Sequence, residues 1–299
     1  MRKLLPSLRI QKANTSRSRY LSSFVAAGAA LSLCMAAIFP ARSALIVYDG
    51  FSYPEGELAS NNGGTGWGGA WTGGGTAVPA ALDYPNLASE EGFLRTTGLN
   101  NGAFRSLSTP LSTGAGEIWG SYLFQAEGSL NNYTGFSLYN GDTELLFIGQ
   151  RFSQTDFGIE VSGGGDGANT PFAVDNSVHL LVFSLTLSGG GGFDASLWID
   201  PVTGIAAPTT GPDAAVAGTQ NFDFDTIRLQ SGEALADYNF DEIRFGTAYR
   251  DVAPFEIATP IVVPEVATGL FYPAGFVILC CARLGSRSRK RDSQLITAD

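Results

Sequence analysis

The segment Val178–Leu187, with the sequence VHLLVFSLTL, decides the fold class of this chain. Its side chains alternate with a period of two residues, which is the period of a β-strand. One face of this strand carries Leu181, Phe183, Leu185 and Leu187. The other face carries Val182, Ser184, Thr186 and Ser188. We expect a strand whose first face packs into a core, with the single histidine, His179, at its start.

Further segments between residues 44 and 260 are β-branched or alternating and are separated by Gly, Asn, Asp and Ser. They are Leu45–Phe51, Glu117–Gln125, Thr134–Tyr139, Glu144–Gly149, Phe157–Ser162, Asp194–Ile199, Thr226–Leu229 and Glu242–Phe245. No apolar spacing of about 3.6 residues is sustained in this region, so helix should be nearly absent. Nine or more strands predict an all-β, two-sheet antiparallel sandwich.

A short internal match joins FDTIRL at residues 224–229 to FDEIRF at residues 240–245. The match is too short to indicate a solenoid repeat. It predicts two neighbouring strands.

The charges of the 299-residue chain are unevenly distributed. Between Leu45 and Val263 there are six Arg, no Lys and 25 Asp or Glu, a net charge of −19. Phosphate recognition depends on Lys and Arg, which release counterions from the nucleic acid. We therefore expect no nucleic-acid partner.

The N-terminal segment, residues 1–43, has the organisation of a signal peptide, here forming a signal helix. A basic leader precedes an uncharged run from Leu21 to Pro40, and small residues surround a predicted cleavage site between Ser43 and Ala44. Signal peptidase is the expected partner. The alternatives are an uncleaved anchor or lipidation at Cys34, although the residue before this cysteine is bulky.

The C-terminal segment contains an uncharged apolar run at residues 266–282, at the short limit for a transmembrane helix. A basic cluster follows it, and Lys and Arg beside a span stay on the cytoplasmic side. We expect a single membrane-anchoring helix, both basic ends inside, and the acidic middle exported to the cell envelope or beyond.

Residues 263–299 resemble the PEP-CTERM sorting signal. The resemblance rests on Val263-Pro264-Glu265, the apolar span after it, and the basic residues Arg287, Arg289, Lys290 and Arg291. It implies recognition and processing by an exosortase. This chain departs from the pattern in having Val266 where a second Pro is usual, and in the eight residues Asp292–Asp299 beyond the basic cluster.

Residues 44–262 resemble an extracellular domain with a concanavalin A-like, or laminin G-like, jelly-roll fold. The matching pieces are Tyr48-Asp49-Gly50-Phe51, Gly64-Thr65-Gly66-Trp67, Ser196-Leu197-Trp198-Ile199-Asp200-Pro201 and Asp241-Glu242-Ile243-Arg244-Phe245-Gly246-Thr247. The resemblance implies a curved jelly-roll sandwich of a kind often used for carbohydrate binding. A fold by itself does not establish that use.

Trp67 and Trp71 stand among small residues in a Gly-rich segment. Exposed there, they would form an aromatic platform for stacking sugar rings. The alternative is that at least one of them packs into the core.

Calcium is the cation that suits an acidic extracellular β-domain, because it takes carboxylate and carbonyl oxygens. Asn221, Asp223 and Asp225 alternate and would share one face of a strand, with Asp49 and Asp241 as weaker candidates. The alternative places Phe222 and Phe224 in the core and leaves the three polar side chains facing water.

Catalytic signatures are sparse. The three cysteines, Cys34, Cys280 and Cys281, lie in the terminal apolar runs, so the middle has neither a disulfide nor a zinc set. His179 lacks a nearby nucleophile motif and is interpreted as structural. Glycoside hydrolysis needs two carboxylates, but the pairs Glu90–Glu91 and Asp241–Glu242 fit it poorly, the second because adjacent strand residues face opposite sides.

These observations predict an exported surface or matrix protein that is not an enzyme and that binds a glycan or associates with exopolysaccharide. Two alternatives stay open. One is a structural coat component without a ligand, and the other is a glycoside hydrolase with unrecognised carboxylates.

Overall fold

The computed structural model describes residues 44–97, 102–111, 116–128, 130, 133–162, 166–187, 192–204, 206–219, 222–232 and 236–256. The predicted signal helix and the predicted C-terminal span lie outside these residues. Within the described ranges, no helix has the length and apolar character needed to cross a bilayer. The chain divides into two compact units after Glu256, and the first contains all the strands below.

The first sheet has nine strands in the order β14-β13-β12-β7-β16-β5-β4-β2, with β1 also paired to β16. Their bounds are β1 Leu45–Asp49, β2 Gly56–Glu57, β4 Thr76–Val78, β5 Phe93–Thr97, β7 Gly116–Gly128, β12 His179–Leu187, β13 Phe193–Ile199, β14 Ala214–Gly218 and β16 Ala236–Gly246.

The second sheet has seven strands in the order β11-β10-β9-β8-β15-β6-β3. Their bounds are β3 Thr72–Gly73, β6 Ala103–Leu111, β8 Thr134–Asn140, β9 Thr143–Gln150, β10 Asp156–Val161, β11 Gly167–Ala173 and β15 Phe224–Ser231. The one helix among the described residues is α2, Tyr249–Val252.

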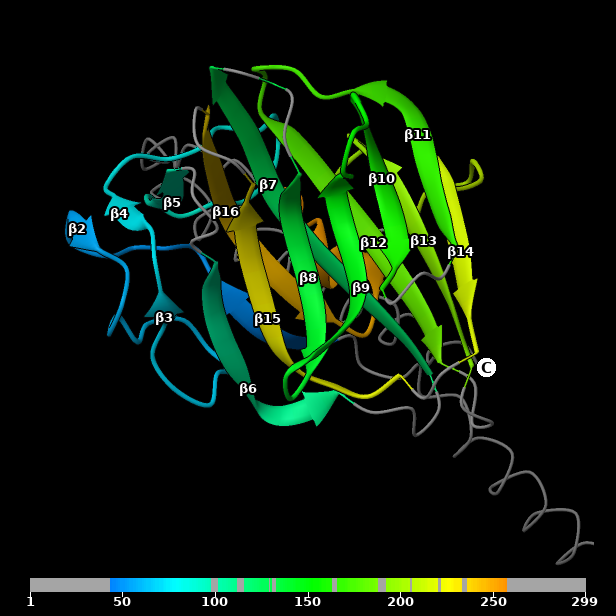
Figure 1. Ribbon diagram of the computed structural model, residues 1–299, viewed down its shortest axis with the longest axis horizontal. Helices are drawn as coiled ribbons and strands as arrows, with labels where there is room; N and C mark the ends of the chain where they lie inside the picture. The colour runs from blue at the N-terminus through cyan, green and yellow to red at the C-terminus, as the bar shows by residue number, and fades with distance from the viewer. Residues whose placement is uncertain are drawn as a thin grey trace, which may run out of the picture. The chain divides into compact units, whose positions relative to one another are not determined.

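The two sheets lie face to face, with β6, β15, β8 and β9 in front of β16, β7 and β12 in Figure 1. All strand pairs among the described residues are antiparallel. The predicted two-sheet antiparallel sandwich is therefore confirmed, and each of the nine predicted segments overlaps a strand. The sequence did not predict β2 to β6, β11 or β14, which are short, Gly-rich or irregular.

Strand β12 has the predicted alternation, and both of its faces are buried. Leu181, Phe183 and Leu185 pack into the core between the sheets. On the other face, Leu180 and Val182 are also fully buried, in a second cluster with Trp119, Trp198 and α2 residues Tyr249 and Val252. The nine-stranded sheet is thus covered on both faces near its centre, which explains the apolar start of this strand.

The internal match belongs to β15 and β16, which lie in opposite sheets. The expectation that its two copies form neighbouring strands is wrong in the sense of pairing. The strands instead face each other across the core, where the rings of Phe224 and Phe245 lie 5.4 Å apart. The similar apolar patterns arise because both strands contribute side chains to the same interior.

Strand β16 contains a bulge at Asp241–Glu242, and Glu242 has a φ of 53°. The bulge marks the point where β16 changes partner along one edge, from β5 at Asp237–Phe240 to β1 at Ile243–Gly246. Both acidic side chains are fully buried, and the expectation of a regular strand at these two residues is wrong. An extra residue in a bulge breaks the alternation.

The Gly-rich segment after β2 joins the two sheets. Isolated bridges pair Thr65 with Tyr48 of β1 and Trp67 with Leu107 of β6. Gly64 and Gly66 have φ values of 73° and 80°, and a Cβ on either would collide with a β1 carbonyl. Glycine is required at both positions because the backbone is left-handed and packs directly against β1.

Candidate functional site

The outer face of the seven-stranded sheet combines aromatic, hydroxyl and charged side chains. On β15, Ile227 and Leu229 point into the core, so Thr226 and Arg228 lie on the outer face. The register then places Ser106 of β6 and Tyr139 of β8 on either side of Thr226. Two strands far apart in sequence thus supply one row of side chains across β15.

The next row along the same face is centred on Arg228. Phe104 of β6 and Ser137 of β8 are its cross-strand partners, and Phe147 of β9 lies beyond Ser137. The ring of Phe147 stacks on Tyr133 with centroids 4.2 Å apart. Ser137 and Phe147 are 0% and 1% exposed, so this second row is largely covered beyond Arg228.

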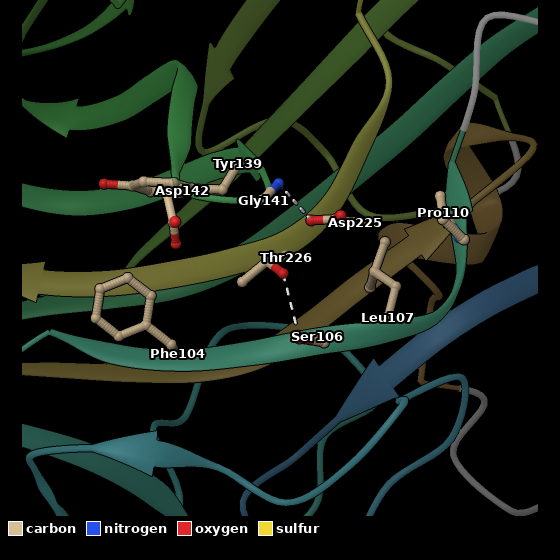
Figure 2. Close-up of a pocket in the computed structure, with 9 residues that line it drawn as sticks. All are labelled: Phe104, Ser106, Leu107, Pro110, Tyr139, Gly141, Asp142, Asp225 and Thr226. Atoms are coloured by element: carbon tan, nitrogen blue, oxygen red, sulfur yellow. Dashed lines mark hydrogen bonds between the residues drawn. The ribbon is translucent and has the colours of Figure 1, made fainter.

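A groove of about 700 Å³ opens over the first row. It is shown in Figure 2 and is lined by Phe104, Ser106, Leu107, Pro110, Tyr139, Gly141, Asp142, Asp225 and Thr226. The hydroxyls of Ser106 and Thr226 lie 3.2 Å apart, and the Gly141 N–H donates to Asp225 Oδ1 over 3.1 Å. These contacts tie β6, β15 and the β8–β9 turn together around the opening.

Two aromatic rings form the apolar part of the groove. Phe104 and Tyr139 meet edge to face with centroids 6.0 Å apart. The Arg228 guanidinium lies 5.1 Å from the Tyr139 ring centroid and 6.0 Å from that of Phe104. Burial, opposed in part by Arg228, raises the pKa of Tyr139 to about 12, so its hydroxyl stays protonated and able to donate a hydrogen bond.

The position of Arg228 is fixed by ionic and polar contacts. Its Nη2 lies 2.9 Å from Glu144 Oε1, with Ser137 Oγ at 3.5 Å. Its Nε is buried and has no hydrogen-bond partner. The glutamate neutralises the arginine, so the guanidinium acts mainly as a flat support for the two rings.

A second arginine extends the face beside β9 and β10. Arg151 Nε lies 2.8 Å from Glu160 Oε2, and its Nη1 donates to Asn169 Oδ1 over 2.8 Å. A Cβ on Gly158 would lie 2.7 Å from the Arg151 Cδ, so glycine there lets the side chain lie close to the sheet. Both glutamates of this face, Glu144 and Glu160, are thus ion-paired.

Trp67 and Trp71 do not form the predicted platform. Trp71 is 1% exposed and its Nε1–H donates to Asp49 Oδ2 over 2.8 Å. Trp67 is half-buried, and its Nε1–H donates to the Tyr48 carbonyl over 2.9 Å. The platform prediction is therefore wrong for Trp71, and the alternative of core packing is confirmed. The Gly-rich segment folds back between the sheets and carries both rings inward.

These rings belong to what we term the buried arginine cluster, formed by Asp49, Tyr53, Trp67, Trp71 and Arg105. Arg105 is ion-paired with Asp49, and its guanidinium lies 4.7 Å from the Trp67 ring centroid and 5.4 Å from that of Trp71. Asp49 is on β1 and Arg105 is on β6, so the pair crosses from one sheet to the other. Burial raises the pKa of Asp49, opposed by the Phe51 N–H and by Arg105.

The structure does not bring together the three residues predicted to bind calcium. Asp225 lines the groove, Asp223 is half-buried and Asn221 lies outside the described residues. Phe222 and Phe224 are fully buried, as the alternative required. Among the described residues no three His, Cys, Asp or Glu side chains are grouped in a way that could hold a metal. Calcium binding therefore stays a prediction.

His179 is held on both ring nitrogens. Its Nδ1 lies 2.7 Å from Asp200 Oδ2 and its Nε2 lies 3.0 Å from Asp175 Oδ1. Desolvation lowers the pKa of His179, but the two hydrogen-bonded carboxylates outweigh it and leave the pKa raised. The ring also meets Phe157 edge to face at 5.1 Å. The structural interpretation of this histidine agrees with these contacts.

Asp241 and Glu242 are the buried acids of the bulge. The Glu90 N–H and the Tyr48 hydroxyl donate to Glu242 Oε1 over 2.7 and 3.0 Å, and Arg244 pairs with its other oxygen. Among the described residues Asp241 has no arginine partner, and burial and then Glu242 raise its pKa well above the usual range. Burial also raises the pKa of Glu242. Both are closed off from solvent, so they offer no exposed pair of carboxylates for glycoside hydrolysis.

Of the residues predicted for signal cleavage and sorting, the structure describes Ala44. Ser43, the sorting motif Val263-Pro264-Glu265 and the basic residues Arg287, Arg289, Lys290 and Arg291 lie outside the described residues. Ala44 is described, and its N–H donates to Thr247 Oγ1 over 3.0 Å.

Sequence reasoning missed Phe104, Tyr139 and Arg228. Tyr139 and Arg228 lie within predicted strands, and alternation alone puts both on outward positions. An arginine and an aromatic ring on outward positions were the available signal. Phe104 had no such signal, because β6 was not predicted.

No protein-family model and no curated protein matches this sequence. Among solved structures, the chain is similar to the globular domain of T. cruzi calreticulin, with 11% identity over 70% of this chain and 91% of that one and a TM-score of 0.45. It is also similar to the exoplasmic/lumenal domain of VIP36 in a Ca²⁺/Man3GlcNAc-bound form. The identity is 11% over 60% of this chain and 84% of that chain, with a TM-score of 0.36.

A carbohydrate esterase from the Shiga toxin-encoding bacteriophage phi24B gives 13% identity over 69% of this chain and 99% of that chain, with a TM-score of 0.38. Similarities at these identities and TM-scores do not establish what the chain binds.

Proposed function

We propose that this protein is an exported, non-catalytic glycan-binding protein of the cell envelope or extracellular matrix. The groove on the outer face of the seven-stranded sheet is the glycan site, and Phe104 and Tyr139 supply its apolar part. The single observation that carries the proposal is this pair of rings placed beside hydroxyl and carboxylate groups in one open groove.

The chemistry of a sugar ring matches these groups. One side of a pyranose presents C–H groups that pack on aromatic rings, while its edge presents hydroxyls that donate and accept hydrogen bonds. Ser106, Thr226 and the protonated Tyr139 can do both, and Asp142 and Asp225 can accept. Of the acidic residues on this face, Glu144 and Glu160 are held by arginines, which leaves Asp142 and Asp225 to accept hydrogen bonds from sugar hydroxyls.

Export and retention complete the proposal. Signal peptidase would cut between Ser43 and Ala44, and β1 begins at Leu45, so the cut would leave the sandwich intact. The C-terminal signal, with Val263-Pro264-Glu265, the apolar span and the basic cluster, would hold the chain in the membrane until an exosortase-type enzyme processes it. The product would then associate with exopolysaccharide, its jelly-roll domain facing outward.

The glycan site is tested with the full-length chain in mild detergent, using a glycan array followed by affinity gels containing the positive polysaccharides. The variants are Phe104→Ala with Tyr139→Ala, and Thr226→Trp, which fills the groove without removing a core side chain. We expect each to weaken binding about tenfold or more. Phe152→Ala is the matched control, because Phe152 is 79% exposed on the β9–β10 turn and should leave binding unchanged.

Each other outcome counts against the proposal. Absence of binding to every glycan would favour a structural coat component. Unchanged glycan binding by Thr226→Trp would show that the glycan binds elsewhere on the protein. Release of reducing ends from a bound polysaccharide would indicate a glycosidase.

The proposed cleavages by signal peptidase and by an exosortase-type enzyme are tested separately, by mass spectrometry of the mature protein from its native cells. We expect an N-terminus at Ala44 and a C-terminus near Pro264–Glu265. An intact N-terminal segment in protein from the envelope would contradict signal-peptide cleavage, and an intact C-terminus would contradict exosortase processing.

A further inference from the structure

The charged groups that line the groove are both carboxylates. Asp142 is exposed on the β8–β9 turn and Asp225 is half-buried at the start of β15. Figure 2 shows both on the side of the turn, across from the β6 strand that carries Phe104 and Ser106. Neither takes part in an ion pair among the described residues.

The nearby positive charge is already neutralised. Arg228, beneath the rings, is paired with Glu144, and Arg151 on the same face is paired with Glu160. The other ion-paired arginines of the sandwich are Arg95 with Glu127, Arg105 with Asp49 and Arg244 with Glu242. The groove therefore presents a negative field beside its aromatic rings.

We infer that the groove selects a glycan built from amino sugars whose amines are free and protonated. This inference rests on the proposed glycan site and names its ligand class. The sugar ring packs on Phe104 and Tyr139, and its ammonium group meets Asp142 and Asp225. The same carboxylates repel uronate and sulfated polymers, because like charges lower the rate and affinity of association.

The experiment compares two oligosaccharides with one backbone. Short β-1,4-linked glucosamine oligomers and their fully N-acetylated counterparts are titrated by calorimetry against the full-length chain. The buffer is mildly acidic, so that the amines are protonated while exposed carboxyl groups are ionised. We expect the amine-bearing oligomer to bind about tenfold more tightly, and added salt to reduce this ratio because exposed charges are screened.

The variant is Asp142→Asn with Asp225→Asn, which removes both charges. An asparagine at 225 keeps an oxygen that can accept the Gly141 N–H, so the turn is preserved. We expect the ratio of the two affinities to fall close to one. Glu55→Gln, which removes a charge from an exposed residue outside the groove, should keep the full ratio.

Two results would overturn the inference while leaving the proposed function in place. One is equal affinity of the unmodified chain for both oligomers. The other is an amine preference that the double variant retains, which would assign the attraction to the general acidity of the chain. Failure of the protein to bind any glycan would instead overturn the proposed function and this inference together.

Discussion

The buried arginine cluster and the groove are built from the same parts but are used differently. In each, one arginine is paired with one carboxylate and its guanidinium lies over two aromatic rings. Arg105 is fully enclosed and also donates to the Gly69 carbonyl over 3.0 Å, the Gly63 carbonyl over 2.8 Å and Asn62 Oδ1 over 3.0 Å. Arg228 lies under an open surface with fewer partners and a buried Nε without one.

The difference shows what burial does to a charged group. Enclosed charges must have every polar atom satisfied, because desolvation is costly. Arg105 meets this requirement through contacts that join both sheets and the Gly-rich segment, so it stabilises the fold. Arg228 needs less, because water still reaches the pair. Of its two rings, Phe104 is half-buried and Tyr139 is 8% exposed, and both line the groove.

The largest expected effect comes from Arg105→Met. It leaves Asp49 buried without its cation, and breaking such a pair costs about 3–5 kcal/mol. Urea unfolding followed by tryptophan fluorescence measures the loss. Arg250→Met, at an exposed position in α2, is the control and should change the unfolding free energy by less than about 0.5 kcal/mol. A loss below about 1 kcal/mol for Arg105→Met would show that the cluster is not an anchor.

Asp241 is fully buried like Asp49, but among the described residues it has no arginine partner. Its raised pKa means that the folded state binds more protons than the unfolded state above about pH 4. The free energy of unfolding therefore falls as pH rises through this window. Asp241→Asn should reduce this fall and be more stable than the unmodified chain near neutral pH.

Stability curves in urea at acidic and neutral pH measure this effect. Asp83→Asn, at an exposed position, is the control and should keep the slope of the unmodified chain. An Asp241→Asn variant with an unchanged pH slope would show that this carboxyl is not the proton-binding group.

The smallest effect on stability is expected from Arg228→Met. The side chains of the Arg228–Glu144 pair are 17% and 24% exposed, and such pairs contribute about 0–1 kcal/mol. Glycan affinity should nevertheless fall severalfold, because the support under Phe104 and Tyr139 is lost. Parallel urea and affinity-gel measurements separate the two readouts. A stability loss as large as that of Arg105→Met would remove the distinction between the two regions.

Much of the fold was predictable because strand alternation is local. The inward residues of β12 followed from their spacing, and the inward placement of Phe222 and Phe224 was one of the two predicted alternatives. The bulge at Glu242 was not predictable, since it follows from a change of partner strands. The strands β5 and β6 were missed because Arg, Ser and Thr interrupt or follow their apolar residues.

The candidate site was less predictable than the fold. Asp225 was identified for calcium but lies in the groove, and Trp71 was identified for sugar stacking but lies in the core. Both residues sit in segments whose composition suits a surface. Whether such a ring faces water depends on how the Gly-rich segment folds against β1 and β6.

The sequence by itself determined the all-β class, the inward face of β12 and the acidity of the middle region, because period and charge are properties of consecutive residues. The tertiary structure decided which arginine is enclosed and which aromatic rings line the groove. It also assembled the groove from Phe104, Tyr139 and Asp225. These residues meet because β15 pairs with both β6 and β8, and that register is fixed by packing between distant segments.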